Sequence, residues 1–361
     1  MPTQERIIGL SSSAVGGHAI TGSQAPQLKL SVILLAHRRR EFLRSAVRSL
    51  LCQSLAKALF EVVVVKDFND DLVDQLAKEH GWIEIQITPN TSVGQSYAQA
   101  IRKSTGEVLV FLDDDDLFEG DKLAIVRSAF ASSPELVFFR DTPMPFAEGA
   151  QHGRLIGPRS PNGLLQVKGS TQRRAVRTIL NRNLNGISST ISIRRKVVLP
   201  HLSSLEQMSG TTDVFLFYLA LNTLQTLTFD PRPLTHYRLH ASSSRVHAHD
   251  FDSHIGKLVS SLERMYENLL IISASLSECR TQTLVDGSAI GVKSVLYSLG
   301  SPGYRLSGQE FRDLLRYAMY RRSPALFVSV VMALVRRTLP IASGILSRLV
   351  FKLQFVEYPV G

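Results

Sequence analysis

Residues 106–116 read GEVLVFLDDDD, a short apolar run that ends in four consecutive aspartates. The run has the length of a buried strand, and carboxylates directly after such a strand lie at the edge where open α/β sheets bind ligands. Neighbouring carboxylates repel one another and need a counter-ion, and hard oxygen donors select Mg²⁺ or Mn²⁺. The aspartates therefore indicate a metal site that would hold a diphosphate. The alternative is an acidic loop that caps a helix beginning near Asp121.

Upstream of the aspartates, apolar runs of strand length alternate with segments of helical spacing. Strands are expected at 28–36, 60–67 and 82–87, and helices at 42–51, 72–80 and 94–103. This alternation predicts a mostly parallel sheet that is covered by helices on both faces. Asp67 ends the second strand, so its carboxylate should lie on the same edge as the four aspartates. The alternative is that Asp67 is a turn residue or a helix cap.

Downstream, the α/β pattern continues to about residue 245. Strands are expected at 136–139, 188–193 and 226–229, and helices at 171–181 and 213–221. The segment 143–172 is rich in Pro and Gly, which predicts a long loop bordering the active site. We therefore expect a flexible tail over 1–27, a catalytic domain over 28–245 and a helical region over 246–361.

The composition excludes several classes of protein. Of 361 residues, 44% are hydrophobic and 20% are charged, which is typical of a globular chain. The two cysteines are too few for a disulfide framework or a zinc site, so we expect a reducing, cytoplasmic location. The formal charge of +10 favours anionic partners. Nucleic acid is not expected among them, because the arginines are dispersed and only 7% of residues are aromatic.

The order of these features resembles the family-2 glycosyltransferases of the GT-A fold, over residues 28–245. The resemblance rests on four segments: LLAHRRREFL (34–43), VVVVKDFND (62–70), NTSVGQSYAQAIRKSTGE (90–107) and GEVLVFLDDDD (106–116). It implies an α/β fold with a mixed, mostly parallel sheet and helices on both faces. It also implies inverting, metal-dependent transfer of a sugar, of the hexosyltransferase kind, from a nucleotide-diphosphate donor to a hydroxyl acceptor.

The resemblance assigns a role to each matching residue. Asp113 and Asp115 would bind the metal and the diphosphate, with support from Asp116, and the metal would be Mg²⁺ or Mn²⁺. The residues expected to contact the nucleotide donor are Asp67, Ala36, Arg38, Asp113, Asp114, Arg238 and His240. Lys66 stands where the family has the first acid of a pair, and Ala36 begins a departure from the family's T-Y-N turn.

Two further segments downstream match the family. Asp213, in SGTTDVFLFYLAL, takes the place of the family's catalytic base, which removes a proton from the acceptor hydroxyl; the alternative is a helix N-cap. The segment YRLHASSS (237–244) resembles the part of the family that closes over the diphosphate, and a basic surface loop is the alternative. His236 and His240 have the spacing of a helical metal site, but Pro231 and Pro233 argue against a helix there.

The sequence also bears on how the enzyme meets its acceptor. The family's processive members carry a Q-x-x-R-W motif, whereas the single tryptophan here is Trp82, so we expect transfer of one sugar. The apolar segment 325–335 is too short to span a bilayer, but with the arginines beside it and the segment 341–356 it could lie on the inner face of a membrane. A glycan or lipid-linked acceptor follows from that reading. Ordinary packed helices or a homodimer contact are the alternatives.

Two other functions remain open on the sequence alone. A nucleotidyltransferase would also use aspartates at strand ends and a metal, but it would release pyrophosphate. Such enzymes usually carry a Gly-rich loop after the first strand, where this chain has His37 to Arg40. A non-catalytic module that binds nucleotide or membrane would bind without turnover.

Overall fold

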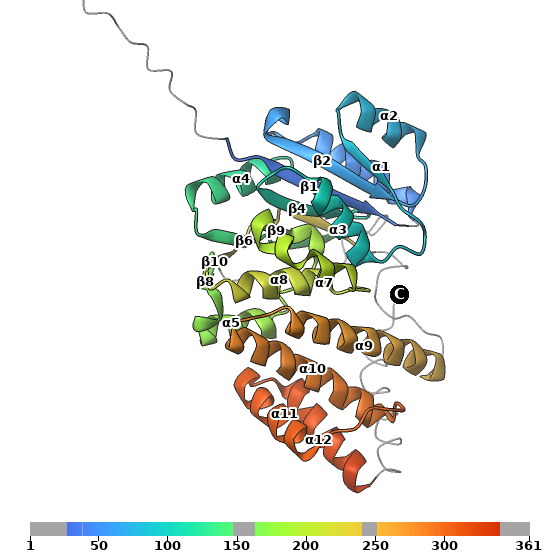
Figure 1. The fold of residues 1–361 in the computed structure, drawn as a ribbon, viewed down its shortest axis with the longest axis vertical. Coiled ribbons are helices and arrows are strands. Elements are labelled where there is room, and N and C mark those ends of the chain that lie inside the picture. Colours follow the sequence, from blue (N-terminus) through green and yellow to red (C-terminus); the bar gives the residue numbers. More distant parts are fainter. Residues whose placement is uncertain (1–26, 38, 147–162, 240–250, 340–361) are drawn as a thin grey trace, which may run out of the picture.

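The computed structural model describes residues 27–37, 39–146, 163–239 and 251–339. Its centre is an eight-stranded sheet with the order β3-β2-β1-β4-β9-β6-β10-β8, in the upper half of Figure 1. The strands are β1 (Leu30–Ala36), β2 (Phe60–Lys66), β3 (Ile83–Gln86), β4 (Val108–Asp113), β6 (Leu136–Arg140), β8 (Leu165–Lys168), β9 (Ile191–Arg194) and β10 (Thr226–Phe229). Only β9 and β8 run antiparallel to their neighbours, so the sheet is mixed and mostly parallel, as expected.

A small second sheet lies beside the first and has the order β5-β11-β7. Its strands are β5 (Leu117–Phe118), β7 (Pro143–Phe146) and β11 (Thr235–Arg238). The expectation of a continuous loop over 143–172 is therefore wrong at both ends, because β7 pairs with β11 and β8 pairs with β10. Pro143 and Pro145 hid β7 in the sequence, although prolines are tolerated on an edge strand such as this one. Residues 147–162 lie outside the described part.

Helices cover both faces of the large sheet because alternate strand residues point to opposite sides. Leu34 and Val64 pack in one core with α1 (Arg40–Leu51), α2 (Asp71–Glu79) and α4 (Lys122–Ser132). Leu35 and Val65 pack in another core with α3 (Val93–Lys103), α5 (Arg173–Asn181) and α8 (Thr212–Asn222). The short helices are α6 (Arg195–Val198) and α7 (Leu202–Glu206), with 3₁₀ turns η1 (Lys57–Leu59), η2 (Gly169–Thr171), η3 (Ser188–Thr190) and η4 (Leu199–His201).

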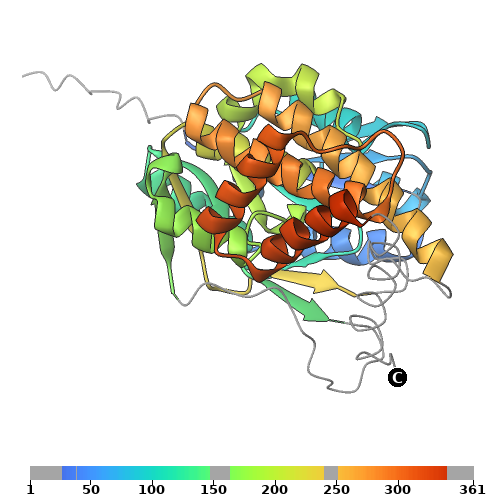
Figure 2. The same cartoon turned by 90° about the horizontal axis from the view of Figure 1, so that it is seen from below.

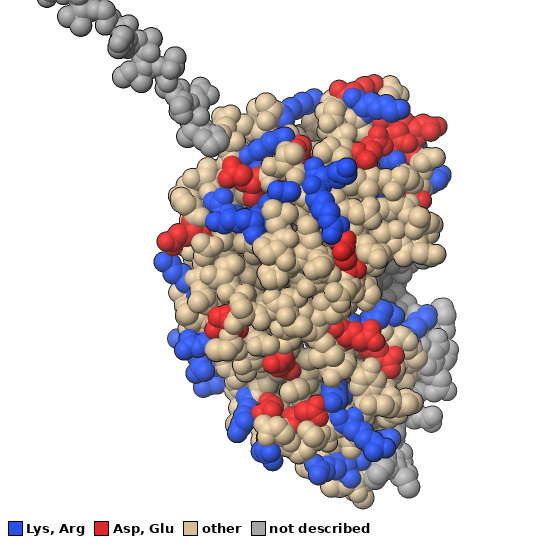
Figure 3. All heavy atoms as spheres, in the orientation of Figure 1, with Lys and Arg blue, Asp and Glu red and all other residues tan. Residues whose placement is uncertain are grey.

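The C-terminal helices form a layer below α5 and α8 in Figure 1, and Figure 2 shows this layer from below. Figure 3, in the orientation of Figure 1, shows basic and acidic side chains interspersed on the surface of this layer. They are α9 (Phe251–Ala274), α10 (Cys279–Leu299), α11 (Gly308–Arg321) and α12 (Pro324–Thr338). Leu269, Ile272 and Val285 belong to the same buried cluster as strand residues Ile33 and Phe138. The helices expected after residue 246 thus share a core with the sheet rather than forming an appendage with a core of its own.

Candidate active site at the carboxyl edge of the sheet

The carboxyl ends of β1, β2 and β4 meet at one edge of the sheet. The parallel register pairs Ala36 with Lys66 and Leu35 with Asp113. Asp67 and the aspartates at 113–116 therefore follow neighbouring strand ends. The structure places them together as the sequence predicted, because β1 lies between the two acidic strands.

Asp113 is held by hydroxyl groups from two other elements. Tyr97, on α3, donates to Asp113 Oδ1 at 3.1 Å, and Ser188, on η3, donates to Oδ2. The backbone amide of Asp113 donates to Ser189 Oγ at 3.0 Å. Burial, with the nearby charge of Asp115, raises the pKa of the Asp113 carboxyl to about 6. This carboxylate is therefore fixed in orientation but short of positive charge.

Arg39 pairs with two carboxylates of the acidic turn. Its guanidinium lies 3.0 Å from Asp114 Oδ1 and also contacts the Asp115 carboxylate. The backbone amide of His37 donates to Asp114 Oδ2 at 3.2 Å. Burial nevertheless raises the pKa of the Asp114 carboxyl to about 8. One arginine thus does not supply enough positive charge for the whole cluster.

Asp116 completes a set of oxygen donors. Its Oδ1 accepts from the backbone amide of Arg238 at 3.0 Å, while Oδ2 is buried and has no hydrogen-bond partner among the described residues. Carboxylate oxygens of Asp113, Asp115 and Asp116 lie within 4.8 Å of one another. Oxygen donors gathered in this way, one of them without a partner, suit a hard divalent cation.

Arg238 fixes the acidic turn from the second sheet. Its guanidinium stacks on Phe42 and on Phe146, with 4.6 Å to each ring centroid. Its Nε donates to the carbonyl oxygen of Asp115 at 2.8 Å, and its Nη2 donates to Ser45 Oγ at 3.1 Å. Arg238 is almost completely buried. Arg238 thus contacts the acidic turn itself, and it supports the turn directly.

The residues at the ends of β1 and β2 have different surroundings. Asp67 is largely buried, and its Oδ2 lies 3.6 Å from His37 Nε2. Lys66 points away from this edge and pairs with Asp74 at 2.9 Å and Glu84 at 3.2 Å. Ala36 has no exposed surface. Its side chain packs in the core where β1 ends, and its predicted contact with the nucleoside stays a prediction. Arg38 and His240 lie outside the described residues.

Asp213 lies in the first turn of α8, and it is not the N-cap. Residue Thr211 is the cap, and its side chain makes no capping bond. Asp213 Oδ2 accepts from the amide of Ile187 at 2.7 Å, and Oδ1 accepts from the amide of Val214 at 2.8 Å. Burial raises the pKa of the Asp213 carboxyl. Phe215 and Leu216 of α8 lie in the same buried cluster as Tyr97, whose hydroxyl donates to Asp113, so α8 covers the same face of the sheet.

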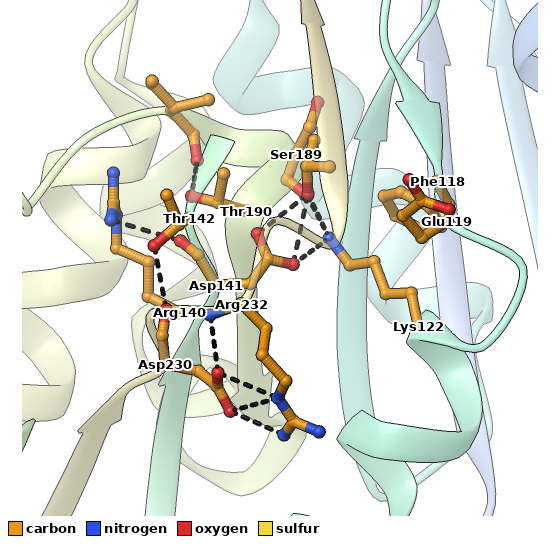
Figure 4. A network of polar contacts seen from close by, with 12 residues as sticks. Phe118, Glu119, Lys122, Arg140, Asp141, Thr142, Ser189, Thr190, Asp230 and Arg232 are labelled. Carbon is orange, nitrogen blue, oxygen red and sulfur yellow. Dashed lines mark hydrogen bonds and ion pairs between the residues drawn. The ribbon is translucent and has the colours of Figure 1, made fainter. Parts of the chain in front are cut away.

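A buried ion pair that we did not predict from the sequence lies next to the η3 turn (Figure 4). Lys122 Nζ lies 2.7 Å from Asp141 Oδ2 and donates to the carbonyl oxygen of Ser189 and to Thr235 Oγ1, both at 2.6 Å. Both charged side chains are fully buried. Lys122 thereby joins α4, β11 and the η3 turn that holds Asp113.

Comparison with known proteins finds one family model that resembles part of the chain. Residues 31–199 match the model of glycosyl transferase family 2. The matched stretch is a little under half of the chain. The match covers β1 through β9 and thus includes the whole acidic turn, Asp67 and the η3 turn.

The relatives of this chain are distant in sequence. EpsH of Bacillus subtilis (strain 168), whose name describes it only provisionally as a glycosyltransferase, is 20% identical over 228 residues, covering 59% of this chain and 62% of EpsH. Residues 1–349 of S. aureus TarS, solved in complex with UDP-GlcNAc, give a TM-score of 0.55 at 15% identity, covering 86% of this chain and 92% of that one. The predicted GT-A fold is thereby confirmed.

A longer TarS structure gives a TM-score of 0.54 at 14% identity, and the likeness covers 88% of this chain but only 54% of TarS. The chain therefore spans a little over half of the longer TarS structure and less than two thirds of EpsH. At these identities the likeness to TarS is evidence of a shared fold.

Proposed function

We propose that this chain is an inverting glycosyltransferase that moves one sugar from a nucleoside diphosphate to a hydroxyl acceptor. The observation that carries the proposal is that Asp67 and the aspartates at 113–116 follow neighbouring strand ends, within the stretch that matches the family 2 model. The TarS fragment was solved with UDP-GlcNAc and with UDP. Uridine diphosphate sugars are therefore the first donors to test.

Different residues of the chain would bind the base and the diphosphate of the donor. Asp67, next to His37, would accept hydrogen bonds from the base. Asp113, Asp115 and Asp116 would hold Mg²⁺ or Mn²⁺ at the diphosphate, and a bound metal would neutralise the charge of the departing diphosphate. Arg39 pairs with Asp114 and Asp115, so its guanidinium must share these carboxylates with the metal or turn to the phosphates.

Asp213 is proposed as the base. Its carboxylate would accept the proton of the acceptor hydroxyl while the new C–O bond forms and the bond to the diphosphate breaks. A base whose pKa is raised toward the operating pH is better matched to this proton transfer than an ordinary aspartate. Because its two oxygens are aligned by backbone amides, the carboxylate keeps one orientation.

The Asp213→Asn variant tests the proposed base. We expect it to bind uridine diphosphate and Mn²⁺ as the wild type does, and to transfer sugar about 10² to 10⁴ times more slowly. Melting temperature and nucleotide titration are the controls for folding. An unchanged single-turnover rate would remove Asp213 from the chemistry, and release of pyrophosphate instead of nucleoside diphosphate would identify a nucleotidyltransferase.

The exposed apolar side chains of α12 bear on the acceptor. On α12, the apolar side chains of Phe327, Val328, Val331 and Leu334 are exposed. No helix in the described part of the chain is long and apolar enough to cross a membrane. We propose a glycan or lipid-linked acceptor, with α12 lying on a membrane surface or against a second copy of the chain. Sedimentation of the protein with anionic vesicles, compared with Val331→Glu, separates these two contacts. The predicted cytoplasmic location stays a prediction.

A further inference from the structure

One peptide group joins a buried arginine to the proposed base. Arg140, the last residue of β6, donates from Nε to the carbonyl oxygen of Gly186 at 3.3 Å. The amide of the next residue, Ile187, donates to Asp213 Oδ2 at 2.7 Å. The carbonyl and the amide belong to the same peptide group. Arg140 and Asp213 are thus connected through two hydrogen bonds and one peptide dipole, which the two charges polarise in the same direction.

The backbone around this peptide group is strained. Ile187 has a φ of +73°, a conformation that a β-branched residue rarely adopts. Thr211, directly before α8, has a φ of +50°. Such conformations cost about 1–3 kcal/mol each and persist where the surroundings impose them. A Cβ added at Gly186 would lie 3.2 Å from Asp213 Oδ2, so glycine allows the close approach.

Arg140 is itself placed unusually for a cation. It is 1% exposed, its Nη1 donates to the carbonyl oxygen of Asp141 at 3.2 Å, and its Nη2 has no partner among the described residues. Figure 4 shows the Asp141 carboxylate facing Lys122, with the Arg140 guanidinium turned away from it. A buried guanidinium is costly without an anion. Burial lowers the pKa of the Arg140 guanidinium to about 10, and the charges of Asp141 and, after it, Asp213 oppose this shift.

We infer that Arg140 is a positioning residue for Asp213, which it holds in place through the Gly186–Ile187 peptide group. The inference rests on the proposed function of Asp213. In the transfer step, the acceptor hydroxyl loses its proton to Asp213 and the nucleoside diphosphate leaves with the electron pair of the broken C–O bond. Arg140 touches none of the reacting atoms. It sets the orientation in which the Asp213 carboxylate meets the hydroxyl.

The chain offers a matched control in Arg194, on β9. This arginine is also buried and also donates to backbone carbonyls, from Nε to Leu136 at 2.8 Å and from Nη2 to Phe130 at 3.0 Å. A third bond runs from Nη2 to the carbonyl oxygen of Ser133 at 3.3 Å, and none of these three bonds reaches the η3 turn or Asp213. Arg140→Met and Arg194→Met therefore remove comparable buried guanidinium groups from different surroundings.

The experiment measures single-turnover transfer, donor KM and affinity for uridine diphosphate in each folded variant. We expect Arg140→Met to lower kcat about 10- to 100-fold, the cost of a small misplacement of a reacting group, with donor KM and nucleotide affinity within twofold of wild type. Arg140→Lys should recover part of the rate, and Arg194→Met should keep it. Wild-type kcat in Arg140→Met, or an equal loss in Arg194→Met, would overturn the inference.

Two further variants keep the test decisive. If Arg140→Met does not fold, Gly186→Ala replaces it, and the crowding of Asp213 Oδ2 should lower kcat while nucleotide affinity is retained; an unchanged kcat would overturn the inference. In the Asp213→Asn background, Arg140→Met should cost nothing more, because the two residues act as a unit. A wild-type rate in Asp213→Asn overturns the proposed base. A normal rate in Arg140→Met, with Asp213→Asn impaired, overturns only the inference.

Discussion

Two groups of carboxylates and cations lie on either side of the η3 turn. Their charges are balanced in one group and left in excess in the other. In the buried group, Lys122 and Asp141 neutralise each other, and Thr235 and Ser189 bond to them. In the acidic turn, four aspartates face one ion-pairing arginine, Arg39, and Asp116 Oδ2 has no partner among the described residues. Charge that is balanced inside the protein stabilises the fold. Charge left in excess is available to a ligand.

The largest expected effect concerns the acidic turn. Asp115→Ala should lower the transfer rate by about 10³-fold or more, since it removes several kcal/mol of transition-state stabilisation by a bound metal. Folding should survive, because the change relieves repulsion among carboxylates. Asp121→Ala is the matched control, as Asp121 is exposed and its side chain makes no capping bond. A wild-type rate in Asp115→Ala, or in protein treated with chelator, would contradict metal dependence.

The next largest effect concerns the buried pair. Lys122→Met should lower the free energy of unfolding by about 3–5 kcal/mol, because it leaves the Asp141 carboxylate buried without its cation. Urea denaturation measures this loss. The double variant Lys122→Met with Asp141→Asn should recover part of it, since no charge is then left unpaired. If the single and double variants lost the same free energy of unfolding, the pair would stabilise the protein through its packing alone and not through its charges.

The pH dependence of stability distinguishes the two groups at a smaller scale. The pKa of Asp113 is raised to about 6 and that of Asp114 to about 8, from an ordinary value of 3.8. The folded state therefore binds protons that the unfolded state has lost, so the free energy of unfolding should fall as pH rises from 5 to 8. Added Mn²⁺ should flatten this slope, as should Asp113→Asn. A free energy of unfolding that rises with pH over this range would contradict an excess of negative charge in the acidic turn.

The smallest effect is expected at Arg39, the counterpart of Lys122 in the acidic turn. Its side chain is 30% exposed, whereas that of Lys122 is fully buried. Arg39→Met should change the free energy of unfolding by about 1 kcal/mol or less, as partly exposed ion pairs contribute little. Urea denaturation of Arg39→Met beside Lys122→Met is the direct comparison. Equal losses would mean that the two groups do not differ as described.

The contrast also explains what could be predicted from the sequence. Continuous β-branched and apolar runs located β2, β4 and β10 within one or two residues, because buried parallel strands need such runs. The acidic turn and Asp67 were found because position at a strand end is a local property. Strand β9 was expected from residue 188 but begins at Ile191, since 188–190 form the η3 turn.

The residues that the sequence did not reveal are those whose partners come from distant elements. Lys122 and Asp141 look like surface charges in their own segments, and only the packing of α4 against β6 and β11 pairs them. Tyr97 and Ser188 reach Asp113 from α3 and η3. The residue type at Ile187 could not predict its positive φ, since isoleucine is among the residues least suited to that conformation.

Arg238 also sets an order of events during synthesis. It bonds to the carbonyl of Asp115 and stacks on Phe42, yet it leaves the ribosome 125 residues after Asp113, the difference between 238 and 113. At roughly 5–20 residues per second, the acidic turn waits about 6–25 s for this support. Over that interval the aspartates of the nascent chain lack the support of Arg238. The rate of translation therefore limits how soon the site can be completed.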